Sequence, residues 1–485
     1  MTDYIHVENP SYETLFQLIK DKGYTIQIPP YQRPYVWSNK KIGQLLDDWR
    51  EFLESRSVPG CWYYMGTLII HKNESNKVMN IVDGQQRLTS ILLIDYILNG
   101  DDSALIKYSQ QLNFSFSHHL SRQNIHSNLE YAKSQLGGKP SSVNISDIFN
   151  HLKFCVIMTE SEDDAFTFFD SQNNRGIQPA AVDVMKAVHL RAIQNDNALR
   201  IDCARRWQDI QTNRSNLFRN SPEDYLDNLV DMALWRIRRW KGKDFENRSD
   251  YNSAMEEFAD NPLKNHGNTI CYYPAGSHRK FTHSHSLSNK QEIPEDDSSE
   301  DKSHLFSIRQ PLYKGVSVFA FFDTYHTIAQ NLFEKETSDR TVRKVRELYQ
   351  KLYIDSRSSK YITDFFIIMV MAYYDKFGSR ELYRFALYTD YIIGTIRLNT
   401  YYLKEVAMRN FTRENNILDL IQISYEPQEV FAYISSLTLK DEHKKPENGP
   451  INCYIEACKK YFGKNYDGDL RDVKLKWAES AYEQF

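Results

Sequence analysis

The chain has 485 residues, of which 41% are hydrophobic, 26% charged and 13% aromatic. This length and composition predict a globular protein with two or three domains, and no apolar run approaches the roughly 20 residues of a membrane span. The formal net charge of −4 lacks the basic excess that nucleic-acid-binding proteins often show. It does not exclude such a protein, because basic residues can be concentrated on one face.

The N-terminal residues and the cysteines predict a cytoplasmic protein. The first residues, MTDYIHVENPSYETLF, have neither the basic start nor the apolar core of a secretory signal. The six cysteines are scattered without a CxxC pair, which argues against a zinc site or a disulfide framework. We therefore expect a reducing compartment.

The first part of the chain alternates between helix and strand patterns. Residues 38–55 place apolar side chains at helical spacing and predict an amphipathic helix. The β-forming runs 63–71 and 78–83, joined by the polar turn KNESNK, predict a hairpin. Apolar residues over 88–98 then predict a buried helix that stops at Gly100.

A second group of elements follows. The run FCVIMT (154–159) predicts a strand, and the residues around EDDAFTFFD predict a helix. The loop SQNNRGI comes next, and Pro179 is placed to open another helix, PAAVDVMKAVHLRAI.

These patterns predict an α+β protein with two domains. Residues 1–195 form the expected α/β domain, and residues 196–485 a mostly α-helical region, because strand signals fade there. The polar, turn-rich stretch at about 258–310 predicts a long loop with partial disorder.

The sequence VDGQQR places several polar residues at the start of the predicted buried helix. Helix N-termini bind phosphate readily, especially where a glycine lets it approach the backbone. Gly84 would allow that approach, Gln85 and Gln86 would donate hydrogen bonds, and Arg87 would pair with phosphate oxygens. Asp83 would hold a phosphate that arrives with Mg²⁺. The alternative is that Asp83 caps the helix and Arg87 lies in solvent or in a salt bridge.

A proline-rich segment, IQIPPYQRPYVW (26–37), combines aromatic and basic residues. It has too many prolines for a central strand. A rigid loop here could offer Tyr31, Tyr35 and Trp37 as stacking surfaces for a base, with Arg33 on phosphate. The alternative is a surface loop that its aromatic residues fasten to the core.

A third segment, DSQNNRG (170–176), is predicted to end a helix. Asn and Gly tolerate positive φ there, and Arg175 offers another donor. Together, IPPYQRPYVW, VDGQQRLTS and FFDSQNNRGIQPAAVDVMKA resemble the signature motifs of the DUF262 (GmrS-type) proteins. The resemblance covers residues 1 to about 195 closely, and the motifs stand in the family's order.

The resemblance implies a ParB/sulfiredoxin-like α/β fold and a role in prokaryotic defence against phage DNA, especially DNA with modified bases or backbone. In the family, DGQQR is the nucleotide-hydrolysis element, which implies an NTP and Mg²⁺ as cofactors, and IPxYQRxYxW is linked to sensing modified DNA. The implied catalytic residues are Asp83, Gln85, Gln86 and Arg87. The expected phosphate-binding residues are Gly84, Gln32, Arg33, Asn174 and Arg175, and the expected DNA-sensing residues are Pro30, Tyr31, Tyr35 and Trp37.

Many proteins of the family continue into a DUF1524 domain with an HNH-type nuclease, in which a histidine acts as general base beside a metal. No such motif follows residue 311 in this sequence. The leading hypothesis is therefore an NTP-hydrolysing, DNA-sensing subunit that acts with a separate HNH/DUF1524-type nuclease. The alternatives are a chain that nicks DNA itself and a non-catalytic DNA-binding module that nucleotide regulates. The preferred NTP, the modification sensed and any homo-oligomer remain open.

The run WRIRRWKGK (235–243) has two interpretations. Arg236, Arg238, Arg239 and Lys241 could follow a DNA backbone. They could equally belong to an ordinary surface helix whose long side chains cover apolar surface.

Two further clusters have less specific patterns. Asp467, Asp469, Asp472 and Lys474 faintly resemble a restriction-type D/ExK motif, but helical i,i+4 pairing explains them better. His278, His283 and His285 could bind a metal. They lack close carboxylate or cysteine partners, which favours a solvated loop.

Overall fold

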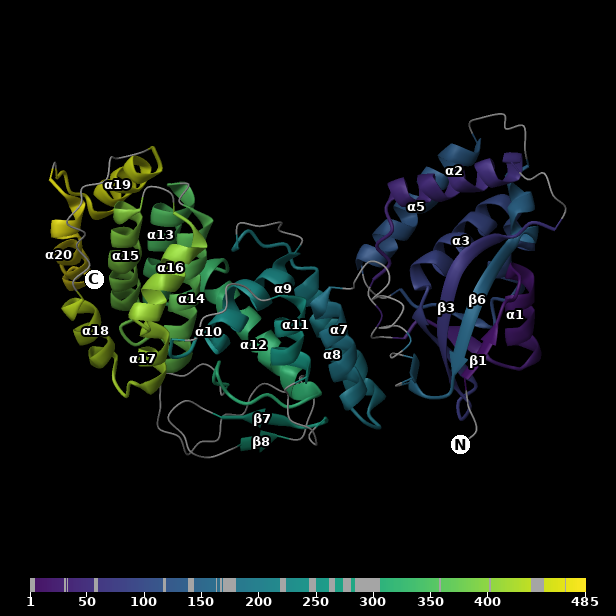
Figure 1. Ribbon diagram of the computed structural model, residues 1–485, viewed down its shortest axis with the longest axis horizontal. Coiled ribbons are helices and arrows are strands. Elements are labelled where there is room, and N and C mark those ends of the chain that lie inside the picture. The colour runs from purple at the N-terminus through teal and green to yellow at the C-terminus, as the bar shows by residue number, and fades with distance from the viewer. Residues whose placement is uncertain are drawn as a thin grey trace. The chain divides into compact units, whose positions relative to one another are not determined.

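The computed structural model divides the chain into two compact units, residues 1–179 and 180–485. We call them the N-terminal and C-terminal units and describe each by itself (Figure 1). The structure describes residues 5–29, 32, 34–55, 60–116, 119–137, 144–162, 164–165, 168, 180–218, 224–243, 250–260, 267–273, 281–283, 306–356, 359–400, 403–437, 449–466 and 468–485.

A six-stranded mixed sheet forms the framework of the N-terminal unit. Its strands are β1 (Ile5–Glu8), β2 (Thr25–Gln27), β3 (Tyr63–Asn73), β4 (Val78–Asp83), β5 (Leu112–Asn113) and β6 (Leu152–Thr159). The order is β1-β6-β3-β4-β2-β5. β3 pairs antiparallel with β4 and parallel with β6, beside which it lies in Figure 1, and β2 runs parallel to β4. The predicted hairpin and the predicted strand at 154–159 are confirmed. β1, β2 and β5 were not predicted, because runs of two to four residues show no periodicity.

Helices supply the other half of the core of this unit. They are α1 (Tyr12–Asp21), α2 (Asn39–Ser55), α3 (Gln85–Asn99), α4 (Ala104–Lys107) and α5 (His119–Gly137), with 3-10 turns η1 (Gly100–Asp102) and η2 (Ile145–Asn150). Phe16, Trp49 and Leu88 from three helices pack into one cluster with Phe154 of β6, all at most 1% exposed. Full burial of one such side chain contributes about 1.5–3 kcal/mol. The predicted helix at 38–55 and the buried helix that ends at Gly100 are both confirmed.

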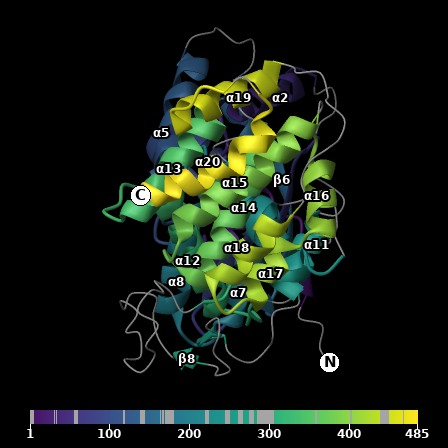
Figure 2. The same ribbon diagram turned by 90° about the vertical axis from the view of Figure 1, so that its left-hand side faces the viewer.

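The C-terminal unit is mostly helical, as predicted. Its helices are α7 (Ala181–Ala192), α8 (Asn197–Gln211), α9 (Tyr225–Asn228), α10 (Trp235–Arg239), α11 (Tyr251–Met255), α12 (Val316–Phe333), α13 (Arg340–Tyr349), α14 (Lys360–Phe377), α15 (Leu382–Asn399), α16 (Glu405–Glu414), α17 (Ile417–Ile423), α18 (Pro427–Ser436), α19 (Gly449–Phe462) and α20 (Leu470–Glu483), with π-helical segments η4 (Leu229–Leu234), η5 (Glu256–Asp260) and η6 (Gln350–Asp355). α14 packs against α15 (Figure 2) and is buried on almost every side. Among the described residues, no helix combines the length and the apolarity that crossing a membrane would require.

Two features of the C-terminal unit differ from the sequence prediction. The predicted first domain ended at residue 195, whereas α7 packs on α8, α11 and α12 and so belongs to the second unit. The predicted loop at about 258–310 contains a small antiparallel sheet of β7 (Ile270–Tyr272) and β8 (Phe281–His283). Its residues 261–266, 274–280 and 284–305 lie outside the described part of the chain.

Candidate functional site

The sheet topology brings two of the three sequence motifs to one edge. β2 and β4 run parallel, so the segments that follow them, residues 28–37 and Gly84 onward, leave the sheet at the same edge. Ligands of open α/β sheets bind outside such carboxyl ends of strands. β3 pairs parallel with β6 and antiparallel with β4, so β6 and β4 run in opposite directions. The chain after Thr159, at the end of β6, therefore leaves the sheet at the opposite edge. Residues 170–176, with Asn174 and Arg175, lie outside the described residues.

Gly84 forms the junction between β4 and α3. Its φ of 94° is a left-handed conformation that favours glycine, and a Cβ there would lie 2.2 Å from Cδ2 of Leu68. Gly84 is also the N-cap residue, and no side chain caps α3. The alternative that Asp83 caps the helix is therefore wrong. Without a side-chain cap, the first-turn N–H groups of α3 are suited to an anion.

Arg87 lies against strand β3. Its Nη2 donates to the carbonyl of Thr67 (2.6 Å) and to Oδ2 of Asp83 (3.0 Å), and its Nη1 donates to the carbonyl of Met65 (3.4 Å). The predicted alternative of a salt bridge is therefore present. The side chain is 26% exposed, and a guanidinium has five N–H donors, so Arg87 keeps donors for a ligand. It nevertheless has a structural role that the sequence analysis did not predict.

Gly66 makes room for Arg87. The register of β3 against β6 shifts between Tyr64 and Thr67, and Gly66 in this interval has a φ of 91°. Gly66 is not among the residues predicted from the sequence. The signal was a glycine inside the β-run YYMGTLIIH, since glycine in a strand often marks a bulge or a close approach.

Gln86 and Gln32 join the aromatic segment to the start of α3. Oε1 of Gln86 accepts from the backbone N–H of Val36 (2.8 Å) and Trp37 (3.3 Å), and Nε2 donates to the carbonyl of Pro34 (2.8 Å). Gln32, which belongs to the aromatic segment, contacts β4: its Nε2 donates to the carbonyls of Ile81 (3.1 Å) and Val82 (2.5 Å). Both side chains thus hold the loop through their Nε2 groups, and Gln86 also through its Oε1, a positioning role that the phosphate-donor prediction did not include.

Tyr35 belongs to the core. Its ring is fully buried, and its hydroxyl lies 2.7 Å from Oγ of Ser90 and accepts from Nδ2 of Asn128 (3.0 Å). Nδ2 of Asn128 also donates to the carbonyl of Trp37 (2.7 Å). Burial of the ring does not fit the prediction that Tyr35 stacks on a base, and it favours the alternative of a loop fastened by its aromatic residues. Trp37 is only partly buried and stays a predicted stacking residue.

The other predicted residues of this segment, Pro30, Tyr31 and Arg33, lie outside the described residues. Their predicted roles in DNA sensing and phosphate binding stay predictions.

Gln85 differs from its neighbour. It is only 4% exposed, and its side-chain amide makes no hydrogen bond within the described part of the chain. Oγ1 of Thr89, one turn further along α3, is also buried and has no hydrogen-bond partner among the described residues. An unsatisfied buried polar group costs about 1–3 kcal/mol, so such groups in a native structure need an explanation. A ligand at the start of α3 would supply the missing partner.

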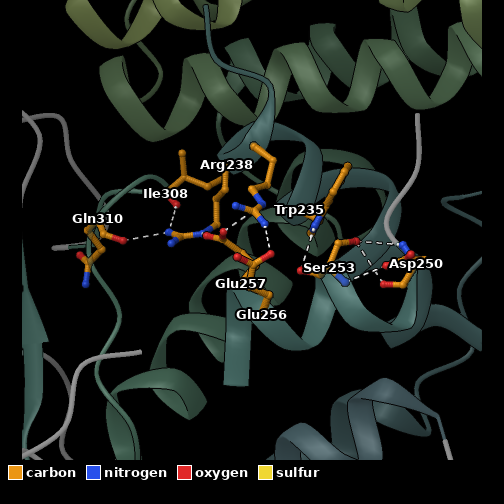
Figure 3. A network of polar contacts seen from close by, with 9 residues as sticks. Trp235, Arg238, Asp250, Ser253, Glu256, Glu257, Ile308 and Gln310 are labelled. Carbon is orange, nitrogen blue, oxygen red and sulfur yellow. Dashed lines mark hydrogen bonds and ion pairs between the residues drawn. The ribbon is translucent and has the colours of Figure 1, made fainter. Parts of the chain in front are cut away.

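The basic run at 235–243 lies mostly inside the C-terminal unit. Nε of Arg238 donates to Oε1 of Glu257 (2.6 Å), and Nη1 donates to the carbonyls of Ile308 (2.7 Å) and Gln310 (2.9 Å), as Figure 3 shows. Arg236 pairs with Glu405, and both of these arginines are buried. The prediction that Arg236 and Arg238 contact a DNA backbone does not fit this geometry.

The other two residues of the predicted DNA-backbone set are more accessible. Arg239 is 27% exposed and pairs with Glu256 and Glu257. Lys241 is exposed, and partial desolvation together with the charges of Arg309 and Arg238 lowers its pKa. Lys241 thus stays the accessible member of the predicted DNA-backbone set.

The acidic cluster near the end of the chain is structural. Asp469 caps α20 and pairs with Arg471. Lys474 is buried and pairs with Asp390 of α15, so the predicted i,i+4 pairing does not account for it. Asp467, His278 and His285 lie outside the described residues, as does the side chain of His283. In the part of the chain that the structure describes, no group of three or more His, Cys, Asp or Glu could hold a metal ion.

Two family models match the chain. The model of the N-terminal domain of the GmrSD restriction endonuclease matches residues 12–190, which include strands β2 to β6, the aromatic segment and the start of α3. The model of a family of unknown function, DUF7834, matches residues 199–449, which cover half of the chain. No curated protein matches the chain.

Proposed function

The chain belongs to the DUF7834 family of unknown function, and because it also matches the GmrSD restriction endonuclease N-terminal domain, we propose that it is the nucleotide-hydrolysing, DNA-sensing subunit of a prokaryotic anti-phage restriction system. The first unit would bind and hydrolyse an NTP at the start of α3. DNA, including modified phage DNA, would be recognised near the segment 30–37. The whole system would act in the cytoplasm.

The observation that carries the nucleotide site is the buried amide of Gln85, which makes no hydrogen bond with any described residue, beside the N-terminus of α3, which lacks a side-chain cap. A bound phosphate would accept hydrogen bonds from the first-turn N–H groups and from the Gln85 amide, whose O and N can exchange places by a flip. Gly84 removes the Cβ that would obstruct this approach. The remaining donors of Arg87 would face the developing negative charge.

Asp83 fits a magnesium ion that arrives with the nucleotide. Its Oδ2 accepts from Arg87, its Oδ1 makes no hydrogen bond in the described part of the chain, and its side chain is about one-third exposed. Carboxylate oxygen is a preferred ligand of Mg²⁺, which would neutralise charge on the transferred phosphoryl group. Gln86 would be a positioning residue, because its hydrogen bonds fix the loop that forms one side of the site.

Gln85 and Gln86 provide a matched test. Gln85→Ala removes no hydrogen bond and takes away an unsatisfied buried amide, so the melting temperature should not fall, whereas NTP hydrolysis should fall at least tenfold. Gln86→Ala removes three hydrogen bonds to the loop, so its melting temperature should fall. Phosphate release with Mg²⁺ and each NTP, alongside thermal melting, distinguishes the two. A Gln85→Ala protein that melts and hydrolyses like the wild type would refute the site.

DNA cleavage is proposed to come from a separate HNH/DUF1524-type subunit. The support is that the chain combines the GmrSD N-terminal domain with a different family, DUF7834. Supercoiled plasmid incubated with the purified chain, Mg²⁺ or Mn²⁺ and each NTP should stay intact while phosphate is released. Nicking that survives repurification and disappears in a point variant of this chain would favour the alternative of a direct nickase. DNA binding that responds to nucleotide without any hydrolysis would favour a non-catalytic module.

A further inference from the structure

The C-terminal unit contains a cavity of about 330 Å³ lined by residues of α13, α15, α19 and α20. Both views of the chain show these helices together at one end of the unit (Figures 1 and 2). Small-molecule pockets have volumes of roughly 300–1,000 Å³. The cavity therefore has room for one small ligand.

The charges on the cavity walls favour an anion. Lys344 forms an ion pair with Glu347 at 2.9 Å, so these two charges offset each other. Arg340 and Lys464 also line the cavity and make no ion pair with any described residue. Among the side chains of the cavity two positive charges are left, which suits the charge of about −1.5 to −2 on a phosphate monoester at pH 7. The fork of Arg340 suits phosphate oxygens, and Lys464 adds a point charge.

The other walls of the cavity are aromatic. The rings of Phe462 and Trp477 are 5.7 Å apart, and the guanidinium of Arg340 lies 4.5 Å from the ring centroid of Phe485. Tyr461 and Phe462 are only partly buried, so part of each ring surface is open. Every nucleobase has a π-face that stacks on such rings without regard to base identity.

A pair of tyrosine hydroxyls adds hydrogen-bonding capacity. The hydroxyls of Tyr383 and Tyr461, both of which line the cavity, lie 3.0 Å apart. Only one of the two can donate in this bond, so the other keeps its proton for another acceptor. A ribose or base oxygen could accept it.

We propose that this cavity binds a nucleoside monophosphate. The phosphate lies between Arg340 and Lys464, and the base lies against Tyr461, Phe462 and Phe485. The site is separate from the start of α3, and it does not rest on the function proposed above.

Photolabelling of the full chain with 8-azido-AMP tests the proposal, because it reports where the base lies. Label should appear on peptides between Tyr461 and Phe485, and unlabelled AMP should compete with it. Adenosine and inorganic phosphate, each of which lacks half of the ligand, should compete at least tenfold more weakly. Arg340→Gln and Lys464→Gln should each weaken labelling roughly 10- to 100-fold, the worth of a hydrogen bond to a charged group.

Two control variants separate this cavity from the NTP site and from a general loss of positive charge. Lys351→Gln removes an exposed lysine that pairs with Asp355 outside the cavity, and it should leave labelling unchanged. Gln85→Ala should also leave it unchanged, so failure of the proposed NTP site would not affect this result. Label that maps elsewhere, equal competition by adenosine, or wild-type labelling of both cavity variants when they melt normally would each overturn the proposal.

Discussion

Gly66 and Arg87 depend on one another, because a Cβ on Gly66 would lie 1.9 Å from Nη1 of Arg87. The two residues come from β3 and α3, and Arg87 is held there by carbonyls of Met65 and Thr67. The strand and the helix start thus form one rigid assembly. A change in β3 is expected to reach the candidate nucleotide site through this contact.

Gly66→Ala should destabilise the protein and also lower NTP turnover, since the methyl group would displace the Arg87 guanidinium. Gly60→Ala is the matched control, because Gly60 has a similar φ of 86° but nothing within 4 Å of its added Cβ. We expect Gly60→Ala to cost about 1–2 kcal/mol from backbone strain alone, and Gly66→Ala to cost clearly more. Urea unfolding and phosphate release measure the two effects. Equal costs for the two variants would show that Arg87 moves away freely.

Tyr35→Phe and Trp37→Ala should separate the structural and the binding roles of the aromatic segment. Tyr35→Phe removes the hydroxyl that Asn128 and Ser90 contact, so unfolding should become easier by about 1–3 kcal/mol. Trp37→Ala should weaken DNA binding by about 1–3 kcal/mol if its ring stacks on a base. Fluorescence anisotropy with labelled DNA gives the binding change. Unchanged DNA affinity in Trp37→Ala would mean that this ring, too, only fastens the loop.

Stability should fall as the pH is lowered from about 6.5 to 4, because of His189. Gly315 donates its backbone N–H to Nδ1 (3.3 Å), so the neutral ring donates from Nε2 to the carbonyl of Phe258 (2.6 Å). Burial, with a smaller contribution from Lys314, lowers the pKa of His189 to about 4. Between pH 6.5 and 4 the unfolded state binds a proton that the folded state does not. The loss is on the order of 3 kcal/mol.

The measurement is urea unfolding as a function of pH. His189→Gln should flatten the profile in that window, whereas His6→Gln, at an exposed position, should not. His326, whose pKa burial also lowers to about 4, adds a similar slope, and Asp227, whose pKa burial raises to about 7, adds a slope of the opposite sign, so some pH dependence should remain. A His189→Gln profile that follows the wild type would contradict the assignment.

Arg238→Met should destabilise the C-terminal unit without acting through DNA. It leaves Glu257 with Arg239 at 3.4 Å as its remaining partner, in place of the bond of 2.6 Å to Arg238, and it frees the carbonyls of Ile308 and Gln310. Loss of one member of a buried pair costs about 3–5 kcal/mol. Lys241→Met, at an exposed position, should change stability by less than about 0.5 kcal/mol. An Arg238→Met protein with wild-type stability but weaker DNA binding would restore the DNA-backbone interpretation.

The sequence by itself determined the local elements and the family motifs of the N-terminal unit. Apolar spacing in 38–55 and 88–98 specifies helices, and the β-runs on either side of KNESNK specify a hairpin, because those patterns need only near neighbours. The VDGQQR segment was correctly placed at the start of a buried helix. Very short strands such as β2 escaped prediction, because remote partners stabilise them.

Only the tertiary structure decided what each polar residue contacts. Gln85 and Gln86 are identical in type and adjacent, yet the amide of Gln85 has no partner among the described residues and that of Gln86 holds residues 34–37. Adjacent residues of a helix point about 100° apart, so each faces a different and distant part of the chain. The contacts of Tyr35 and Arg238 are also set by tertiary structure, because their partners Asn128 and Glu257 come from other elements. No local pattern contains those partners, and packing alone brings them together.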